Sequence, residues 1–211
     1  DNANYNIAVG ITALDNITTG DINTAIGHNT LTDNTSGGFN TAIGTNSLRS
    51  NINGDHNTAS GSHALYANTN GDKNTAIGGY SLSQGSSSNF NTAVGYASLY
   101  NSGGSYNVAV GYNAHYENTS GTRNIAIGVD ALKLHDAEDD NLAIGYEALK
   151  GEGAAGEYNV AIGNYSQKTT SGDYNTAVGY ESMKNNTTGT RNIAIGSKAY
   201  DAADTENDNL A

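Results

Sequence analysis

The sequence predicts an all-β fold, a parallel β-solenoid with coils of about 17 residues. The pattern Asn-x-Ala, followed by Ile or Val and then Gly in nearly every complete unit, returns at steps of 16 to 18 residues. Gly and Asn punctuate every unit, and no apolar stripe of period 3.6 runs through the chain. Helices of useful length are therefore not expected.

Each unit begins with an anchor asparagine. In a stack of coils these amides lie above one another, and we expect a ladder in which each amide donates to the next or caps a turn. The thirteen anchors are Asn6, Asn23, Asn40, Asn57, Asn74, Asn91, Asn107, Asn124, Asn141, Asn159, Asn175, Asn192 and Asn209.

A short strand follows each anchor. The next residue is Thr, Ile, Val or Leu, the second is always Ala, and the third is Val or Ile in every complete unit except that of Ser60. β-Branched residues favour a pleated backbone over a helix. The fourth residue is always Gly, as at Gly10 and Gly196, which predicts that the strand ends in a bend or a special backbone angle.

The rest of the unit holds a second packed segment and a turn. The seventh residue after the anchor is small, and the eighth is Leu in eight of twelve units, for example Leu31 and Leu48. Gly stands three residues before the next anchor in nine of twelve connections, as at Gly20 and Gly54. A tight turn with a positive φ is expected there.

A unit of this size cannot bury a core alone, whereas stacked units can. Coils that advance about 4.8 Å each would form a rod of roughly 58 Å. No linker or change in composition interrupts the repeats, so residues 1–211 are predicted to form a single continuous solenoid domain. Because the chain stops in the middle of a repeat, we expect it to be a fragment of a longer fibre protein.

Strand side chains alternate between two faces, which leaves two arrangements open. If Ala and Leu fill a narrow interior, Ile and Val form a long apolar band outside. If Ile and Val fill the interior, the outer face carries Asn, Ala and Gly. Both arrangements favour close approach of like chains, because such faces are rarely left exposed in a monomer.

The segments from Asn23 to Leu31 and from Asn40 to Leu48 resemble known repeats. They are similar to the head repeats of trimeric autotransporter adhesins, and more so to the NTAIG…AL repeats of phage tail fibres and bacterial surface fibres. The resemblance covers the whole chain, although the adhesin heads use a shorter repeat. It implies a left-handed β-roll, a homotrimer, an extracellular location and, in longer relatives, a following chaperone domain of the endosialidase type.

Composition excludes several classes of partner. The chain has 21 acidic and 9 basic residues and a net charge of −12, which repels nucleic acid and anionic membrane surfaces. No apolar run is long enough to insert into a membrane. The chain has no Cys, which rules out disulfides and thiolate metal sites. We expect no cofactor, no catalytic residues and no resident metal.

Two groups of residues are candidates for metal sites, the histidines and two acidic loops. None of the five histidines forms a pair with metal-ligand spacing, so all five are expected to be exposed in loops: His28, His56, His63, His115 and His135. The other group is two acidic loops that could hold Ca²⁺, although a solvated loop is favoured. These loops carry Asp136, Glu138, Asp139 and Asp140, and Asp201, Asp204, Glu206 and Asp208.

Aromatic residues recur at fixed positions of the repeat, and we expect mainly that they pack at the corners of the coils. One set precedes an anchor: Tyr5, Phe39, Phe90, Tyr106, Tyr158 and Tyr174. Another follows the repeated Gly: Tyr96, Tyr112, Tyr146 and Tyr180. The tyrosines at the start of variable loops, Tyr66, Tyr100 and Tyr116, are the predicted surface contacts.

The leading functional hypothesis is a non-enzymatic structural fibre segment, the shaft or head of a phage tail fibre or bacterial surface adhesin. It would assemble as a homotrimer and attach to a host surface glycan or protein receptor. One alternative is a solenoid with a face that binds glycans or ice, although the threonine row after the anchors is broken. A glycan-degrading enzyme is disfavoured, because the repeat columns carry no clustered acids outside loops.

Overall fold

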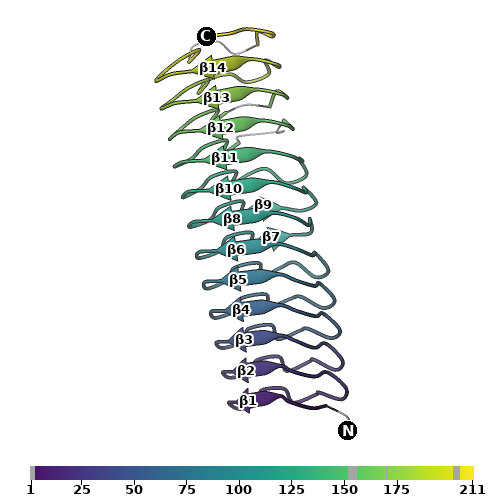
Figure 1. The fold of residues 1–211 in the computed structure, drawn as a ribbon. Helices are drawn as coiled ribbons and strands as arrows, with labels where there is room; N and C mark the ends of the chain where they lie inside the picture. Colours follow the sequence, from purple (N-terminus) through teal and green to yellow (C-terminus); the bar gives the residue numbers. More distant parts are fainter. Residues whose placement is uncertain (1–2, 152–155, 170, 202–204) are drawn as a thin grey trace.

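The fold is a β-solenoid with a single parallel sheet along its length (Figure 1). The computed structural model describes residues 3–151, 156–169, 171–201 and 205–211. Each strand of the main sheet belongs to one coil and pairs with the strand of the next coil. The main sheet contains β1 (Ile7–Val9), β2 (Thr24–Ile26), β3 (Thr41–Ile43), β4 (Thr58–Ser60), β5 (Thr75–Ile77), β6 (Thr92–Val94), β8 (Val108–Val110), β10 (Ile125–Ile127), β11 (Leu142–Ile144), β12 (Val160–Ile162), β13 (Thr176–Val178) and β14 (Ile193–Ile195).

The strands pair in register with the sequence repeat. Thr24, Ala25 and Ile26 of β2 lie opposite Thr41, Ala42 and Ile43 of β3, and this register continues to β14. Two further strands, β7 (Asn101–Ser102) and β9 (Glu117–Asn118), form a small parallel pair on consecutive coils. The predicted all-β parallel solenoid is confirmed, and the described residues contain no helix.

The interior is narrow and is filled by the repeated small residues and leucines. From β2 to β14 the strand alanines, such as Ala25 and Ala42, are fully buried, and so are most of the leucines that follow them, such as Leu31 and Leu48. Each buried leucine contributes about 1.5–3 kcal/mol through the hydrophobic effect. Of the two arrangements that the sequence left open, the first is therefore correct: Ala and Leu lie inside, and Ile and Val point outward.

The anchor asparagines lie in a single file along the interior edge of the sheet. The side-chain oxygen of each anchor accepts a hydrogen bond from the backbone N–H of the next anchor, at 2.7 Å from Asn23 to Asn6 and 2.9 Å from Asn57 to Asn40. The side-chain nitrogen of most anchors donates to a backbone carbonyl of the next coil, as from Asn57 to Gly71 at 2.7 Å, whereas that of Asn159 is buried without a partner among the described residues. The amides thus join each coil to the next through the backbone.

A second amide column, missing from the sequence predictions, runs parallel to the anchors. Asn34, Asn51 and Asn68 stand eleven residues after three successive anchors and are fully buried. In this column each amide donates directly to the amide below it, at 2.9 Å from Asn51 to Asn34 and at 2.9 Å from Asn68 to Asn51. Each side chain also donates to the carbonyl three residues later, as from Asn51 to Gly54 at 3.0 Å.

The two glycine columns have different structural causes. The glycine that ends each strand has the expected special angle, with φ of 140° at Gly27 and 124° at Gly44. The glycine three residues before an anchor does not adopt the positive φ that we expected. At Gly37 a Cβ would lie 2.4 Å from the carbonyl oxygen of Gly54, so close approach between neighbouring coils demands glycine there.

Positive φ falls instead on residues with full side chains. In each coil it occurs immediately before the anchor and at the sixth and eighth residues after it, where 37 non-glycine residues have φ between 47° and 64°. Each such residue costs about 1–2 kcal/mol relative to a right-handed backbone. Hydrogen bonds to neighbouring coils hold them, for example from Leu31 N to Ser47 O at 3.1 Å and from Asn46 N to His28 O at 2.9 Å.

Candidate functional surfaces

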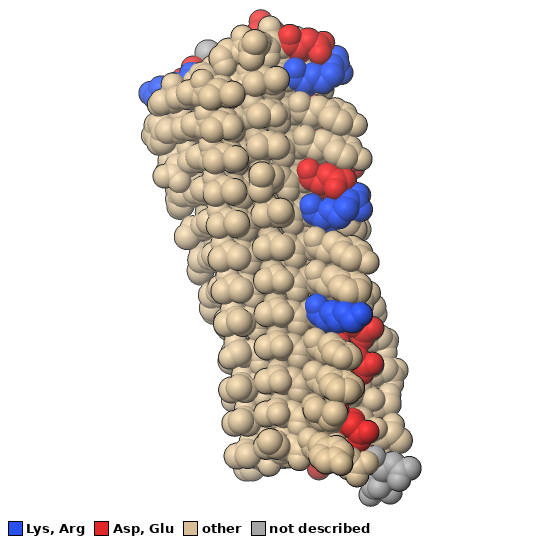
Figure 2. Space-filling model, in the orientation of Figure 1, with Lys and Arg blue, Asp and Glu red and all other residues tan. Residues whose placement is uncertain are grey.

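The outward side chains of the main sheet form a long surface that we call the strand face. It consists of the first and third residues of each strand, all of them Thr, Ser, Val, Ile or Leu. Ile77 is 44% exposed and Ile195 65% exposed. Figure 2 shows uncharged rows running the length of the rod, with the charged residues at its right-hand edge and its ends. The strand face is thus continuous, regular and uncharged.

Beside the strand face runs the edge column, which consists of the residues immediately before the anchors. The aromatic residues of this column are exposed and do not fill corners of the core. They stack on the next coil, with ring centroids 4.9 Å apart for Phe90 and Tyr106 and 4.8 Å apart for Tyr158 and Tyr174. Phe39 stacks in the same way on His56 at 4.7 Å. Contacts between coils therefore continue on the outer surface.

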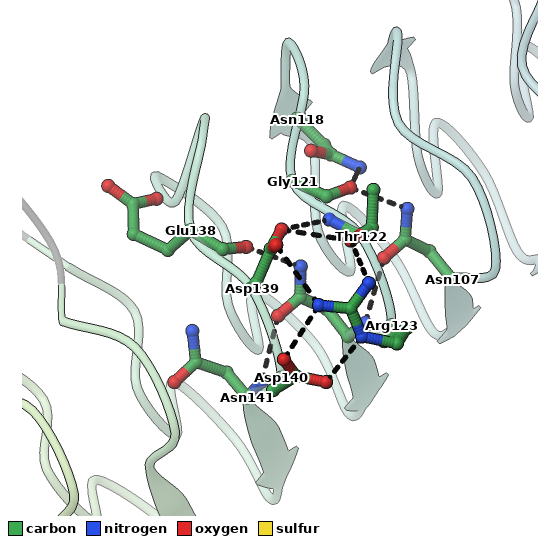
Figure 3. Close-up of polar contacts among 10 residues, drawn as sticks. Asn107, Asn118, Gly121, Thr122, Arg123, Glu138, Asp139, Asp140 and Asn141 are labelled. Carbon is green, nitrogen blue, oxygen red and sulfur yellow. Dashed lines mark hydrogen bonds and ion pairs between the residues drawn. The ribbon is translucent and has the colours of Figure 1, made fainter.

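Two arginines of the edge column join coils by ion pairs (Figure 3), whereas Lys73 lies over the ring of Phe90. Nε of Arg123 donates to Asp140 at 2.7 Å, and Nη2 donates to Asp139 at 3.1 Å. Arg191 holds Asp208 in the same way at 2.6 Å. The hydrogen bond from Arg123 lowers the pKa of Asp140. Three of the candidate calcium ligands, Asp139, Asp140 and Asp208, are therefore bound by a guanidinium.

The described part of the acidic loops places its other polar groups in separate contacts. The backbone carbonyl of Glu138 accepts a hydrogen bond from the anchor Asn124 at 2.6 Å, and the carboxylate of Glu206 accepts one from Tyr200 at 3.1 Å. Asp204 lies outside the described residues. Within the described part of the chain, no group of three or more His, Cys, Asp or Glu side chains is placed to hold a metal ion.

The expectation of exposed histidines is wrong for two of the five. His28 and His56 are exposed and His63 is half-buried, but His115 and His135 lie in the interior. His115 takes the place of the core leucine, and His135 stands in the column of buried asparagines. Burial lowers the pKa of His135 to about 3, and burial together with the nearby His135 lowers the pKa of His115 to about 3.

The two buried histidines are also poorly paired. Among the described residues, neither ring nitrogen of either histidine has a hydrogen-bond partner, and the side-chain oxygen of the adjacent Asn118 has none. A Cβ at Gly151 would lie 2.9 Å from Cδ2 of His135, so the glycine leaves room for the imidazole. The core is therefore weakest in polar pairing at these two coils.

A cluster of tyrosines forms a groove on a different part of the coil. Tyr96 stacks on Tyr112 at 5.8 Å and Tyr100 stacks on Tyr116 at 5.0 Å, so that two parallel rows of rings face each other. Tyr80 closes one end, tilted against both rows. The groove has a volume of about 440 Å³, and it is completed by Ala97, Asn113 and Lys133.

The predicted surface contacts are thus partly brought together. Tyr100 and Tyr116 form one wall of the groove, whereas Tyr66 lies beyond Tyr80. There it accepts a hydrogen bond from Arg49 at 3.0 Å and contacts His63, whose ring stacks on Tyr80 at 4.9 Å. Sequence reasoning missed Tyr80 as a groove residue, although its distance from its anchor places it close to Tyr96 of the next coil.

Beyond Lys133 the same strip of surface becomes an ion-pair ladder. Lys133 pairs with Asp130 at 3.1 Å, and Glu147 lies between Lys150 at 3.0 Å and Lys168 at 2.9 Å. The charges alternate and largely cancel. The tyrosine groove is therefore bordered by a locally balanced surface rather than by a basic or acidic patch.

The described part of the chain contains no helix long and apolar enough to cross a bilayer.

In the comparisons with known proteins, no family model, curated protein or solved structure gave a significant match.

Proposed function

We propose that the chain is a structural segment of an extracellular fibre, the shaft or head of a phage tail fibre or bacterial surface adhesin. In this proposal three copies, wound left-handed as the sequence resemblance implies, pack their strand faces around a common axis. The fibre holds an attachment site away from its anchor and contacts a surface glycan or protein receptor. The proposed role requires no catalysis and no cofactor.

The strand face is the observation that carries this proposal. It presents Ile and Val outward along the rod, exposed from β1 to β10 in most coils and half-buried from β11 to β13, and exposed apolar surfaces of this extent are uncommon on soluble monomers. The sequence places none of its 30 charged residues on that face, despite the net charge of −12. Because each coil presents a similar uncharged surface, parallel copies in register can pack together along their full length.

Substitution on the strand face tests the proposal. We expect Ile77→Lys to dissociate the assembly, because a buried ammonium at the interface would lack a partner. Ile52→Lys is the matched control. Ile52 is also an exposed isoleucine, at 39%, but it lies in a loop and not on the strand face. Sedimentation velocity of the two variants measures the effect. Equal behaviour of both variants would show that the strand face is not the contact.

The alternative of ice binding has a limited structural basis. Thr24, Thr41, Thr58, Thr75 and Thr92 lie opposite one another in five consecutive strands. From β8 to β12 the same row consists of Val108, Ile125, Leu142 and Val160. Thermal hysteresis of ice growth would support ice binding. Hydrolysis of a glycan panel would support the glycan-degrading enzyme that the sequence disfavours.

A further inference from the structure

We propose that the tyrosine groove is a binding site for a neutral oligosaccharide that lies along the axis of the rod. This inference rests on the attachment role proposed above and names the chemistry of the ligand. The site consists of Tyr80, Tyr96, Tyr100, Tyr112, Tyr116 and the floor residue Asn113.

The groove exists because two coils differ from their neighbours in three columns at once. At the sixth residue after the anchor, Ala97 and Asn113 stand between the bulkier Tyr80 and the charged Asp130. In the same two coils, tyrosines occupy both the fifth and the ninth positions after the anchor. The small residues form the floor and the tyrosines form the walls. The groove therefore spans two coils, or roughly 10 Å along the rod, which is about the length of a disaccharide.

The walls present groups that suit a polyhydroxylated ligand. Rings stacked at 5.0 Å with planes 6° apart, as Tyr100 and Tyr116 are, cover each other's faces and leave edges and hydroxyls for the groove. Ring edges carry partial positive charge, and a tyrosine hydroxyl both donates and accepts hydrogen bonds. Asn113 adds an amide to the floor. Sugars offer hydroxyls of both kinds together with apolar C–H surfaces.

The charges around the groove favour a neutral ligand over an anionic one. Lys133 is the one cationic side chain of the groove lining, and Asp130 pairs with it at 3.1 Å. Glu117 follows Tyr116 in the sequence, and the whole chain carries a net charge of −12. Burial raises the pKa of Tyr116, and Tyr100 and Glu117 raise it further, so the hydroxyl remains a neutral donor at physiological pH. Sulfated or sialylated chains therefore gain nothing here.

Calorimetric titration of the intact protein with cellotriose, chitotriose, maltotriose and xylotriose tests the proposal, with sialyllactose as the anionic comparison. We expect at least one neutral trisaccharide to bind. Tyr100→Ala combined with Tyr112→Ala should weaken that binding by at least about tenfold, as expected for aromatic anchors. Tyr158→Ala is the matched control, because Tyr158 is also an exposed tyrosine stacked on a neighbour, at 4.8 Å from Tyr174.

A second variant separates loss of binding from loss of folding. Ala97→Tyr fills the floor with the residue that Tyr80 already places at the same position, with nearly the same φ. We expect it to fold and to lose binding. Absence of binding by all four neutral sugars, binding of sialyllactose alone, or an equal loss in Tyr158→Ala would overturn the proposal. The oligomer mass is a separate readout, so the fibre assembly and the groove can fail independently.

Discussion

At the scale of single residues, the anchor asparagines connect the sequence repeat to the stacking of coils. Asn57 receives the backbone N–H of Asn74, donates its own backbone N–H to Asn40, and donates its amide to the carbonyl of Gly71. A side chain of this size that both donates and accepts is needed at every step. Neither Asp, which lacks the donor, nor Leu, which lacks both functions, meets that requirement.

We therefore predict that Asn57→Ala destabilises the protein by about 1–3 kcal/mol, because it leaves the buried backbone N–H of Asn74 without a partner, while the carbonyl of Gly71 keeps the hydrogen bond from Asn68. Asn70→Ala is the control. Asn70 is exposed, and the hydrogen bond identified at its amide oxygen comes from the exposed side chain of Asn53. The control should change the unfolding free energy by less than about 0.5 kcal/mol. Urea denaturation followed by circular dichroism measures both. Similar losses in the two variants would contradict the role of the ladder.

The buried histidines predict a loss of stability in acid. In the unfolded chain His115 and His135 return to the ordinary pKa of 6.5, whereas in the folded chain the pKa of each is about 3. Between these values the unfolded state takes up protons that the folded state excludes. Stability therefore falls as the pH decreases through this window, and it is fully present above it.

This acid sensitivity can be removed by restoring the repeat. Leu99 and Leu132 occupy the position of His115 in the neighbouring coils, and Asn118 occupies the position of His135. When the pH drops from about 7.5 to about 5, the melting temperature of the double variant His115→Leu, His135→Asn should decrease less than that of the wild type. Equal decreases in the two proteins would show that the carboxylates, and not these histidines, set the acid response.

At the scale of the elements, each three-residue strand is stabilised mainly by the packing of its central alanine. Ala126 lies directly between Ala109 and Ala143 of the neighbouring strands, and all three are fully buried. These alanines belong to the same buried cluster as the interior leucines, such as Leu132, so a larger side chain here would have to displace packed neighbours. Strands of three residues can therefore stack only where this column stays small.

Ala126→Leu should accordingly destabilise the coil by about 1–3 kcal/mol or more through overpacking. Ile125→Leu in the same strand is the control, since Ile125 points outward and Leu142 already stands at that place in the next coil. Thermal melting of the two variants provides the measurement. An unchanged melting temperature in Ala126→Leu would mean that the column assignment is wrong.

The sequence predicted the strands well because their columns are almost invariant. Ala at the second position and Gly at the fourth define a strand and its end in every complete coil. The second segment was harder, since residues such as Leu31, with φ of 49°, adopt a backbone that their side chains disfavour. Hydrogen bonds between coils impose that backbone, and no local propensity reveals it.

The candidate surfaces were predictable to different degrees. The burial of His115 and His135 is not apparent from metal-ligand spacing, on which the expectation of exposed histidines rests, although counting from Asn107 and Asn124 places both in buried columns. Tyr100 and Tyr116 were recognised as surface residues. Their partners Tyr96 and Tyr112 occupy another column, and only the path of the coil shows that the two columns form opposite walls.

At the scale of the whole molecule, the rod has a sheltered interior and two distinct outer surfaces. The strand face is uncharged and continuous, which suits contact with identical chains, whereas the tyrosine groove is local and occurs in two coils. Ion pairs such as Arg123 with Asp140 join coils on the edge column and are exposed, so solvent screens them and they contribute little to stability. The stack therefore depends mainly on its interior ladders and its packing.

The most direct test of the proposed fibre is the absolute mass of the unmodified chain in solution, measured by light scattering after size exclusion. The account predicts a particle of three times 21.7 kDa that persists on dilution into the low micromolar range. A stable particle of 21.7 kDa, with the strand face exposed to water, would contradict it.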